Sequence, residues 1–283
     1  MGPDGDPAAL GELLRSRRAR LTPAAVGLPP GERRRTPGLR REEVALLANL
    51  SPTYYAFLEQ GRQVRPSTQV LDALATALRL DAAERQYLDV LAYGRAGRAG
   101  PRPAPDGRSE PPSEVVAVGV VDLVRRLDPH PTFVKGRRWD VLAANSAACE
   151  LFTDWDARPP ADRNLVRWMF TDEQARHVYL DWEREARAML GRFRLATAAY
   201  TNEPSVAALI AELLHASARV RQWWPNHDVV PIGGSGVKRL RHPRLGPTEY
   251  SHVVLSVTDH PEQTLVTHTA RTDGRFTGGR DGS

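Results

Sequence analysis

The sequence has little of what several protein classes require. One cysteine, Cys149, stands among 283 residues, so an internal disulfide is impossible and a reducing, cytoplasmic location is expected. The longest apolar run, Val115–Val121, is far shorter than the about 20 residues that cross a bilayer. The first residues lack the basic and then apolar pattern of a signal peptide. We therefore expect no association with a membrane.

Motifs for catalysis, metals and phosphate binding are scarce as well. Four histidines in the second half stand without the spacing that places two ligands on one helix face: His227, His252, His260 and His268. The stretch Gly233–Gly236 does not match the Gly-x-Ser-x-Gly motif of a nucleophile elbow, because residue 237 is valine where the motif requires glycine. No phosphate-binding glycine loop is found. The sequence thus predicts no enzyme, no bound metal and no cofactor.

Positive charge, in contrast, is concentrated in one segment. The net charge is +5, yet residues 15–65 alone contain eleven arginines and four glutamates, a balance of +7. Such a concentration is typical of a surface that binds phosphates, and a solvated basic face is the alternative.

Residues 41–65 within this segment predict two short helices joined by a tight turn. Val44, Leu47 and Ala48 have the spacing of one apolar helix face. Asn49 tolerates the left-handed backbone of a turn, and Ser51 followed by Pro52 is a strong start for the next helix. These features predict a helix-turn-helix.

Further helices are expected on both sides of this motif. Leu10–Leu21 precedes it, and helices that begin at Ser67 and Asp81 follow it. Between the first two helices, Thr22–Arg40 is too rich in proline and glycine for a regular helix. Its Arg33, Arg34 and Arg35 can contact the DNA backbone or a minor groove, or simply be solvated. The expected N-terminal domain is all-α with five helices.

The row from Leu10 to Ala92 resembles the Xre/Cro/C1 repressor type of helix-turn-helix domain. The matching residues include Val44-Ala45, Leu47-Ala48, Ser51, Tyr55, Leu58–Arg62, Pro66-Ser67 and Leu71 to Leu78. The resemblance implies base-reading positions at Pro52, Thr53, Ala56 and Phe57. It implies backbone contacts from Arg41, Arg62 and Arg65, and Tyr54 can reach a phosphate through its hydroxyl. It also implies a structural ion pair between Arg18 and Glu59.

The second half of the sequence differs from the first in composition and in its expected secondary structure. Gly94–Ser113 is nearly all glycine, proline, alanine and charge, which predicts a linker. Val115–Leu127 is amphipathic and can connect the domains or pack in a dimer. Two short strands, a helical middle that includes Tyr179–Tyr200, and three C-terminal strands then predict an α+β domain with an antiparallel sheet. The strands are expected at Thr132–Val134, Arg138–Ala143, Gly236–Arg241, Tyr250–Val257 and Leu265–Thr269.

Residues 131–270 resemble the ligand-binding domain of MmyB-like transcription regulators. The matching motifs are Arg138–Ala143 with Asn145, Asn164-Leu165, Phe170–Asp172, Asp181–Glu183, Trp224 with His227–Val229, and Lys238 with His242-Pro243. The resemblance implies a PAS-like sheet and a fatty-acid-like ligand. Most aromatic residues lie in this half and can line an apolar pocket, or form an ordinary core. The expected ligand-binding residues are Trp139, Asn145, Trp168, Phe170, Trp182, Arg187, Trp224 and His227, with Arg187 pairing a ligand carboxylate.

Together these patterns predict a DNA-binding transcriptional regulator that senses a small apolar ligand. The expected division is a DNA-binding domain over residues 1–93, a linker over 94–114, a ligand-binding domain over 115–275 and a disordered tail over 276–283. A homodimer on a pseudo-palindromic, double-stranded operator is expected. The alternative is a regulator whose C-terminal domain serves only dimerisation or protein interaction.

Overall fold

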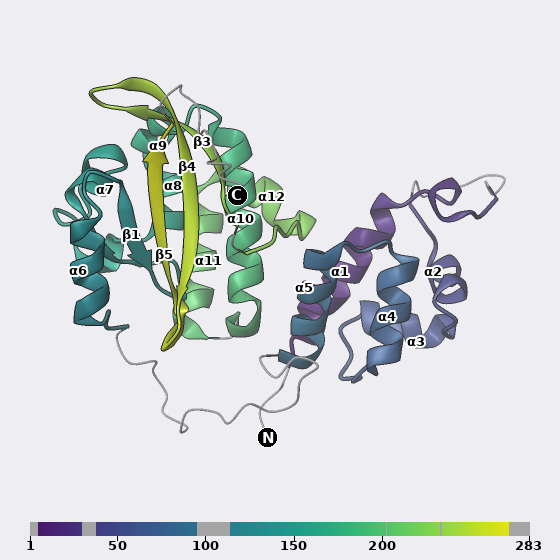
Figure 1. The fold of residues 1–283 in the computed structure, drawn as a ribbon. Helices are drawn as coiled ribbons and strands as arrows, with labels where there is room; N and C mark the ends of the chain where they lie inside the picture. The colour runs from purple at the N-terminus through teal and green to yellow at the C-terminus, as the bar shows by residue number, and fades with distance from the viewer. Residues whose placement is uncertain (1–4, 30–37, 95–113, 202, 233, 272–283) are drawn as a thin grey trace, which may run out of the picture. The chain divides into compact units, whose positions relative to one another are not determined.

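The structure is a computed structural model that describes residues 5–29, 38–94, 114–201, 203–232 and 234–271 (Figure 1). Its contacts divide the chain into two compact units, which are described separately. The first unit combines Met1–Ser113 with Arg184–Ile232, and the second combines Glu114–Glu183 with Gly233–Ser283. These units are defined differently from the domains expected from the sequence, whose boundaries at residues 94, 115 and 276 stay a prediction.

The regular elements among the described residues of the first unit are all helices. Its N-terminal part is formed by α1 (Pro7–Arg20), η1 (Ala24–Val26), α2 (Arg41–Leu47), α3 (Pro52–Glu59), α4 (Thr68–Ala77) and α5 (Ala82–Tyr93). Its second part is formed by α10 (Trp182–Thr197), η4 (Ala198–Tyr200), α11 (Pro204–Ala216), α12 (Ala218–Trp223) and η5 (Trp224–Asn226). The five α-helices of the first part confirm the predicted all-α domain, and Arg33, Arg34 and Arg35 lie outside the described residues.

Local sequence signals explain where these helices begin. Asp6 and Ser67 cap α1 and α4, with side-chain oxygens that accept hydrogen bonds from Ala9 N at 3.0 Å and Val70 N at 3.3 Å. Asp81 and Glu84 form the reciprocal pair of hydrogen bonds that was expected at the start of α5. Each cap satisfies backbone N–H groups that the helix itself leaves without partners.

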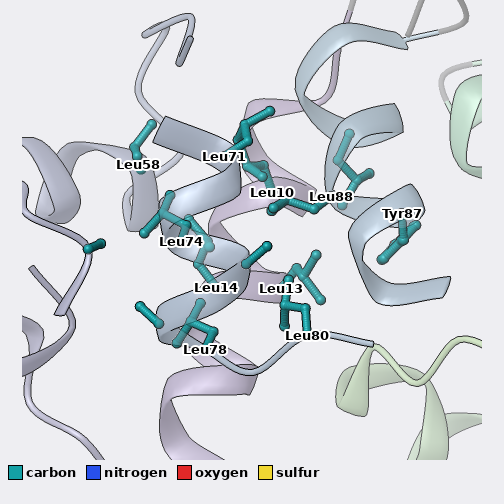
Figure 2. Close-up of a cluster of buried hydrophobic side chains, with 14 of the residues drawn as sticks. Leu10, Leu13, Leu14, Leu58, Leu71, Leu74, Leu78, Leu80, Tyr87 and Leu88 are labelled. Atoms are coloured by element: carbon teal, nitrogen blue, oxygen red, sulfur yellow. The ribbon is translucent and has the colours of Figure 1, made fainter. Parts of the chain in front are cut away.

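A leucine-rich core holds the N-terminal helices together. Figure 2 shows Leu10, Leu13 and Leu14 of α1 among side chains from α4 and α5. The contact of α1 with α3 is very close at Gly11, where an added Cβ would lie 2.6 Å from Glu59 O. Because full burial of one leucine contributes roughly 1.5–3 kcal/mol, this cluster is a major source of stability.

The second unit has helices around one antiparallel sheet (Figure 1). Its helical elements are α6 (Val118–Arg126), α7 (Ser146–Leu151), η3 (Pro160–Asp162), α8 (Leu165–Thr171) and α9 (Glu173–Val178). Its strands are β1 (Thr132–Lys135), β2 (Val141–Ala144), β3 (Gly236–His242), β4 (Gly246–Val257) and β5 (His260–Ala270). The helices and the two separate groups of strands confirm the predicted α+β fold.

The sheet joins distant parts of the sequence. Its described strands have the order β2-β1-β5-β4-β3, and each neighbouring pair is antiparallel. The pairing of Phe133 with Val266 brings the first strand against the last. The two strand groups that the sequence predicts separately therefore form one continuous surface.

At β1 and β5, both faces of this sheet are packed against other side chains of the second unit. On one face, Val124 of α6 packs with Val134 and Leu265. On the other face, Phe133 contacts Phe152 and His268 through their rings. Phe133 and Val134 are adjacent, so the alternation of a β-strand sends them to opposite faces. The amphipathic segment expected at Val115–Leu127 thus covers a sheet face with one side.

The helical middle of the second half differs from the sequence expectation in one place. A single helix was predicted over Tyr179–Tyr200, but α9 ends at Val178 and α10 begins at Trp182. Tyr179 instead forms an isolated bridge with Leu240 of β3, and Leu180 N donates a hydrogen bond to Arg239 O at 3.1 Å. The pairing with a strand that lies far away in the sequence interrupts the helix, and a helical pattern cannot reveal it.

Candidate DNA-reading face and ligand-binding region

The turn before α3 is built from residues suited to its geometry. Asn49 has a left-handed backbone with φ of 54°. Ser51 Oγ then accepts a hydrogen bond from Tyr54 N at 3.1 Å, and Pro52 is the first residue of α3. After α3, Gly61 has φ of +67°, which most L-residues adopt only with strain. The start of α3 is therefore held firmly by local contacts.

The outward side of α3 contains the four residues expected to read bases. Pro52 and Thr53 are exposed, whereas Ala56 and Phe57 are half-buried. The guanidinium of Arg62 lies 4.1 Å from the centre of the Phe57 ring, and its Nε donates to Gln60 Oε1 at 3.0 Å. A cation is thus held beside an apolar ring on this side of the helix.

On the inner side of α3, Glu59 is the centre of a buried charge cluster. Its carboxylate lies 2.5 Å from Arg18 Nε and 2.7 Å from Arg41 Nε, and it accepts a hydrogen bond from Tyr55 OH at 2.9 Å. Burial would raise the pKa of Glu59, but hydrogen bonds from Arg18 and Arg41 bring it below its usual value. Burial also raises the pKa of Tyr55, so its hydroxyl stays a donor. This cluster ties α1, α2 and α3 together.

The residues expected to contact the DNA backbone lie in several settings. Arg41 is about half exposed although its Nε faces Glu59, so part of its guanidinium is accessible. Tyr54 is half-buried, and its burial raises the pKa of its hydroxyl. The guanidinium of Arg65 lies 5.8 Å from the centre of the Tyr93 ring. In the sequence, Arg41 precedes the exposed start of α3 and Arg65 follows the helix.

The second unit contains a large cluster of packed rings, which we call the aromatic cluster. Its members are Phe133, Phe152, Trp155, Trp168, Tyr179, Tyr250 and His268. Ring centres of Trp168 lie 5.8 Å from Trp155 and 6.2 Å from Tyr179. Among the described residues, the indole nitrogens of Trp155 and Trp168 are buried without a hydrogen-bond partner. A buried N–H without a partner is costly, so these two donors mark a place where a polar group would be stabilised.

Two further groups bring polarity to this cluster. His268 is completely buried, and burial together with the nearby charge of Lys238 lowers its pKa to about 3. Its ring is therefore neutral at pH 7, and Nδ1 lies 3.2 Å from Pro131 O. Lys238 of β3 is buried too, with its ammonium 5.8 Å from the centre of the Tyr179 ring. The sequence analysis did not include either residue among the ligand-binding residues, because the alternation of a strand alone does not identify its neighbours.

The other predicted ligand-binding residues of the second unit are occupied by local contacts. Asn145 caps α7 through Ala148 N at 3.0 Å, and its Nδ2 donates to His130 O at 2.8 Å. Trp139 lies under the ammonium of Lys135, at 4.2 Å from the ring centre. Trp182 Nε1 donates to Met169 O at 3.2 Å, and its ring is 6.3 Å from that of Phe170.

The remaining three predicted ligand-binding residues belong to the first unit. Arg187 is exposed, with its guanidinium 4.9 Å from the centre of the Trp223 ring. Trp224 lies under the guanidinium of Arg194 at 4.2 Å. His227 is buried next to α1, where its Nε2 is 3.3 Å from Glu12 Oε2. The structure therefore separates these three from the aromatic cluster by unit.

No helix among the described residues is long and apolar enough to cross a membrane. No group of histidine, cysteine, aspartate and glutamate residues in the described ranges has the arrangement of a metal site, although the rings of His252 and His268 stack at 5.9 Å.

Comparison with known proteins identifies both halves of the sequence. A helix-turn-helix domain model matches residues 9–88, and the model of the MmyB-like transcription regulator ligand binding domain matches residues 116–277. No curated protein matches the chain. Because the second model covers more than half of the 283 residues, the chain belongs to the MmyB-like transcription regulators, with a helix-turn-helix DNA-binding domain ahead of a ligand-binding domain.

Proposed function

We propose that this regulator reads its operator with the first turn of α3. Thr53 is exposed there and can hydrogen-bond a base or contact a thymine methyl. Pro52, Ala56 and the edge of Phe57 offer apolar contact. The observation that carries the proposal is the buried Glu59 cluster, because it fixes the inner side of the same helix and leaves this row outside. A helix held in this way presents its side chains in one orientation, as base reading requires.

Contacts with the DNA backbone supply the affinity in this proposal. Arg41, Arg62, Arg65 and the hydroxyl of Tyr54 bind phosphates, as does the Arg33–Arg35 segment outside the described residues. Two copies of the chain bind a pseudo-palindrome, with the two copies of α3 about 34 Å apart along one face of the duplex. The basic balance of residues 15–65 supports this arrangement.

The ligand is proposed to be a long apolar molecule with an acidic head, such as a fatty acid. The rings of the aromatic cluster, together with Phe170 of α8, supply apolar surface. The acidic head would meet the buried Lys238 ammonium and the indole N–H groups of Trp155 and Trp168. The two indole N–H groups are buried without a hydrogen-bond partner among the described residues, which supports this choice. Lys238 thereby replaces Arg187 as the cation for the carboxylate, because Arg187 is exposed and belongs to the other unit.

Selection from random duplex DNA tests the DNA-reading proposal. The full chain is expected to enrich one motif with two half-sites about one helical turn apart. Selection with the Thr53→Ala variant should relax one position in each half-site. An enriched motif without internal symmetry would contradict the dimer, and failure to enrich any motif would contradict sequence-specific binding.

Quenching of tryptophan fluorescence by a brominated fatty acid tests the ligand proposal. The acid is expected to quench, and Lys238→Met should weaken its binding by about 10- to 100-fold, which corresponds to a lost hydrogen bond to a charged group of about 1.5–3 kcal/mol. The matched control is Arg187→Met, which should bind the acid normally. The methyl ester of the same acid should bind wild type and Lys238→Met equally, which separates loss of the charge pair from misfolding.

The second candidate function is a domain that only mediates protein contacts. The close ring packing of the aromatic cluster favours it, because an edge-to-face pair such as Phe152 and His268 at 5.2 Å is also typical of a filled core. Absence of quenching by both acid and ester, together with a dimer in analytical ultracentrifugation, would support this candidate over the sensor.

A further inference from the structure

The backbone carbonyl groups of residues 224–228 are held from two sides by arginine side chains. From α1, Arg17 donates to Asn226 O at 3.1 Å and to His227 O at 2.7 Å. Arg20 donates to Asn226 O at 2.5 Å, and its guanidinium lies 2.7 Å from Asp228 Oδ1. These contacts link the DNA-binding domain to a segment about 210 residues further along the chain.

The other side of this segment is held by Arg194 of α10. Its guanidinium donates to Trp224 O and to Asp228 O, the latter at 3.0 Å, and lies over the Trp224 ring. Arg194 is only 3% exposed, and burial lowers its pKa to about 10. Three arginines thus converge on one turn and satisfy its carbonyls. Burying such a cation is costly, so the carbonyl acceptors are needed to hold it there.

Apolar contacts extend this joint into the core of the DNA-binding domain. Leu195 and Ala198 are buried in the same hydrophobic cluster as the leucines of α1, and Val229 packs against it. At the end of η4, Thr201 Oγ1 is 3.3 Å from Asp6 Oδ2, the residue that caps α1. The association of α10 with the helix-turn-helix therefore includes buried apolar surface as well as polar contacts.

The shape of the turn is set by His227. Its backbone is left-handed, with φ of 54°, and its ring is buried beside Glu12 of α1. Four of the residues by which the second half resembles MmyB-like domains lie at this joint: Trp224, His227, Asp228 and Val229. All four belong to the first unit, whereas the aromatic cluster belongs to the second.

We propose that residues 224–229 form a coupling turn, through which the ligand-binding region holds the helix-turn-helix against α10. The division between the two units falls within α10, after Glu183, and the first residue of the helix is Trp182. Twelve residues separate Trp182 from Arg194, which is about 18 Å along a helix. A displacement at the start of α10 is carried along this rigid element to the coupling turn and so to α1. The linker 94–114 is not required to transmit it.

The regulatory role of the coupling turn rests on the proposed function. The attachment of the helix-turn-helix to α10 through this turn does not. Spin-label distance measurements on the full chain test it without DNA or ligand. Labels are placed at two exposed positions of the first unit, Gln69→Cys in α4 and Ala211→Cys in α11, with Cys149→Ser removing the natural thiol. One narrow distance distribution is expected, because the coupling turn joins the two helices into one body.

Substitutions at the coupling turn test whether its contacts cause the narrow distance distribution. Arg20→Ala combined with Asp228→Asn removes partly exposed contacts without touching the leucine core, and it should replace the narrow peak with a broad distribution. Arg194→Met should do the same from the other side. The matched controls are Arg79→Ala and Asp122→Asn, which lie outside the turn and should keep the narrow peak. A broad distribution without any substitution, or a narrow one in both turn variants, would overturn the proposal.

Addition of a medium-chain fatty acid extends the measurement to regulation. If the acid changes the affinity of the full chain for its selected operator, that change should be lost in Arg20→Ala/Asp228→Asn. A full response in this variant would show that the signal bypasses the coupling turn. Binding of the acid, followed by quenching, should be the same in wild type and variant, so failure of the ligand proposal is recognised separately.

Discussion

The side chains of Arg41 and Glu59 meet at 2.7 Å, although 18 residues separate them in the sequence. The contact joins the first residue of α2 to the last residue of α3, and Arg18 of α1 completes it. The carboxylate is fully buried, whereas both arginines retain contact with solvent. The orientation of the DNA-reading helix thus depends on a charge cluster that includes one of the expected phosphate contacts.

Removing either partner of the Arg18–Glu59 pair should destabilise the chain. A buried charge that loses its partner costs about 3–5 kcal/mol, and the partial exposure of Arg18 places this pair at the lower end. Thermal melts of Arg18→Ala, Glu59→Ala and the double variant measure the coupling. The double variant is expected to be less damaged than the sum of the two single variants. Strict additivity would show that the pair contributes no coupling.

The contribution of Glu59 to the free energy of unfolding should depend on pH. Its pKa lies below the ordinary 4.5 in the folded chain, so its contribution is present above about pH 4.5 and is lost as the pH falls through the folded pKa. Urea unfolding between about pH 7 and pH 3 should show wild type converging on Glu59→Gln as the pH decreases. A constant difference between the two proteins would mean that Glu59 does not titrate below its unfolded value.

Thr53 and Arg62 should affect DNA binding in different ways. Arg62→Ala is expected to weaken binding to operator and random DNA alike, and to reduce the salt slope by about one unit. Thr53→Ala should instead change the preference at one position, at a cost of about 1–3 kcal/mol for the preferred base. Titrations at several salt concentrations measure both effects. An unchanged motif with Thr53→Ala would show that another part of α3 faces the bases.

The free energy of unfolding should decrease in acid because of His227. Burial lowers its pKa to about 3, with further lowering by Arg194, Arg17 and Arg20, while Asp228 opposes this. The carboxylate of Glu12 also faces the ring, at 3.3 Å from Nε2. The unfolded chain takes up a proton below about pH 6.5 and the folded chain does not, so stability falls from there toward pH 3. His227→Asn keeps a residue that tolerates the left-handed backbone, and its unfolding should depend less on pH in this range.

His268 provides the control for that measurement. Its pKa is also lowered to about 3, but its ring lies in the aromatic cluster of the other unit. His268→Gln should reduce the acid dependence of stability without broadening the spin-label distances of the first unit. If His227→Asn leaves the acid dependence of wild type unchanged, the ring is not held neutral by the contacts described.

The sequence by itself determined the elements that depend on neighbouring residues. Ser51 and Pro52 start α3, Asn49 and Gly61 turn the chain, and Asp81 with Glu84 starts α5, because each acts on backbone groups within four residues. The five strands were also predictable from alternation and β-branched residues. The candidate DNA-reading row came from the resemblance to Xre-type domains, and the helix period by itself indicates only which side of α3 is apolar.

Only the tertiary structure decided which distant residues meet. Three observations depend on residues that lie more than 100 positions apart in the sequence. They are the pairing of β1 with β5, the burial of His268 among aromatic rings, and the contact of Arg17 with His227. Many arginines in residues 15–65 look alike in sequence, and only packing distinguishes Arg17 at the turn from Arg18 at Glu59. The physical reason is that a local signal fixes the conformation of a segment, whereas its partner is selected by the burial and hydrogen bonding of the whole fold.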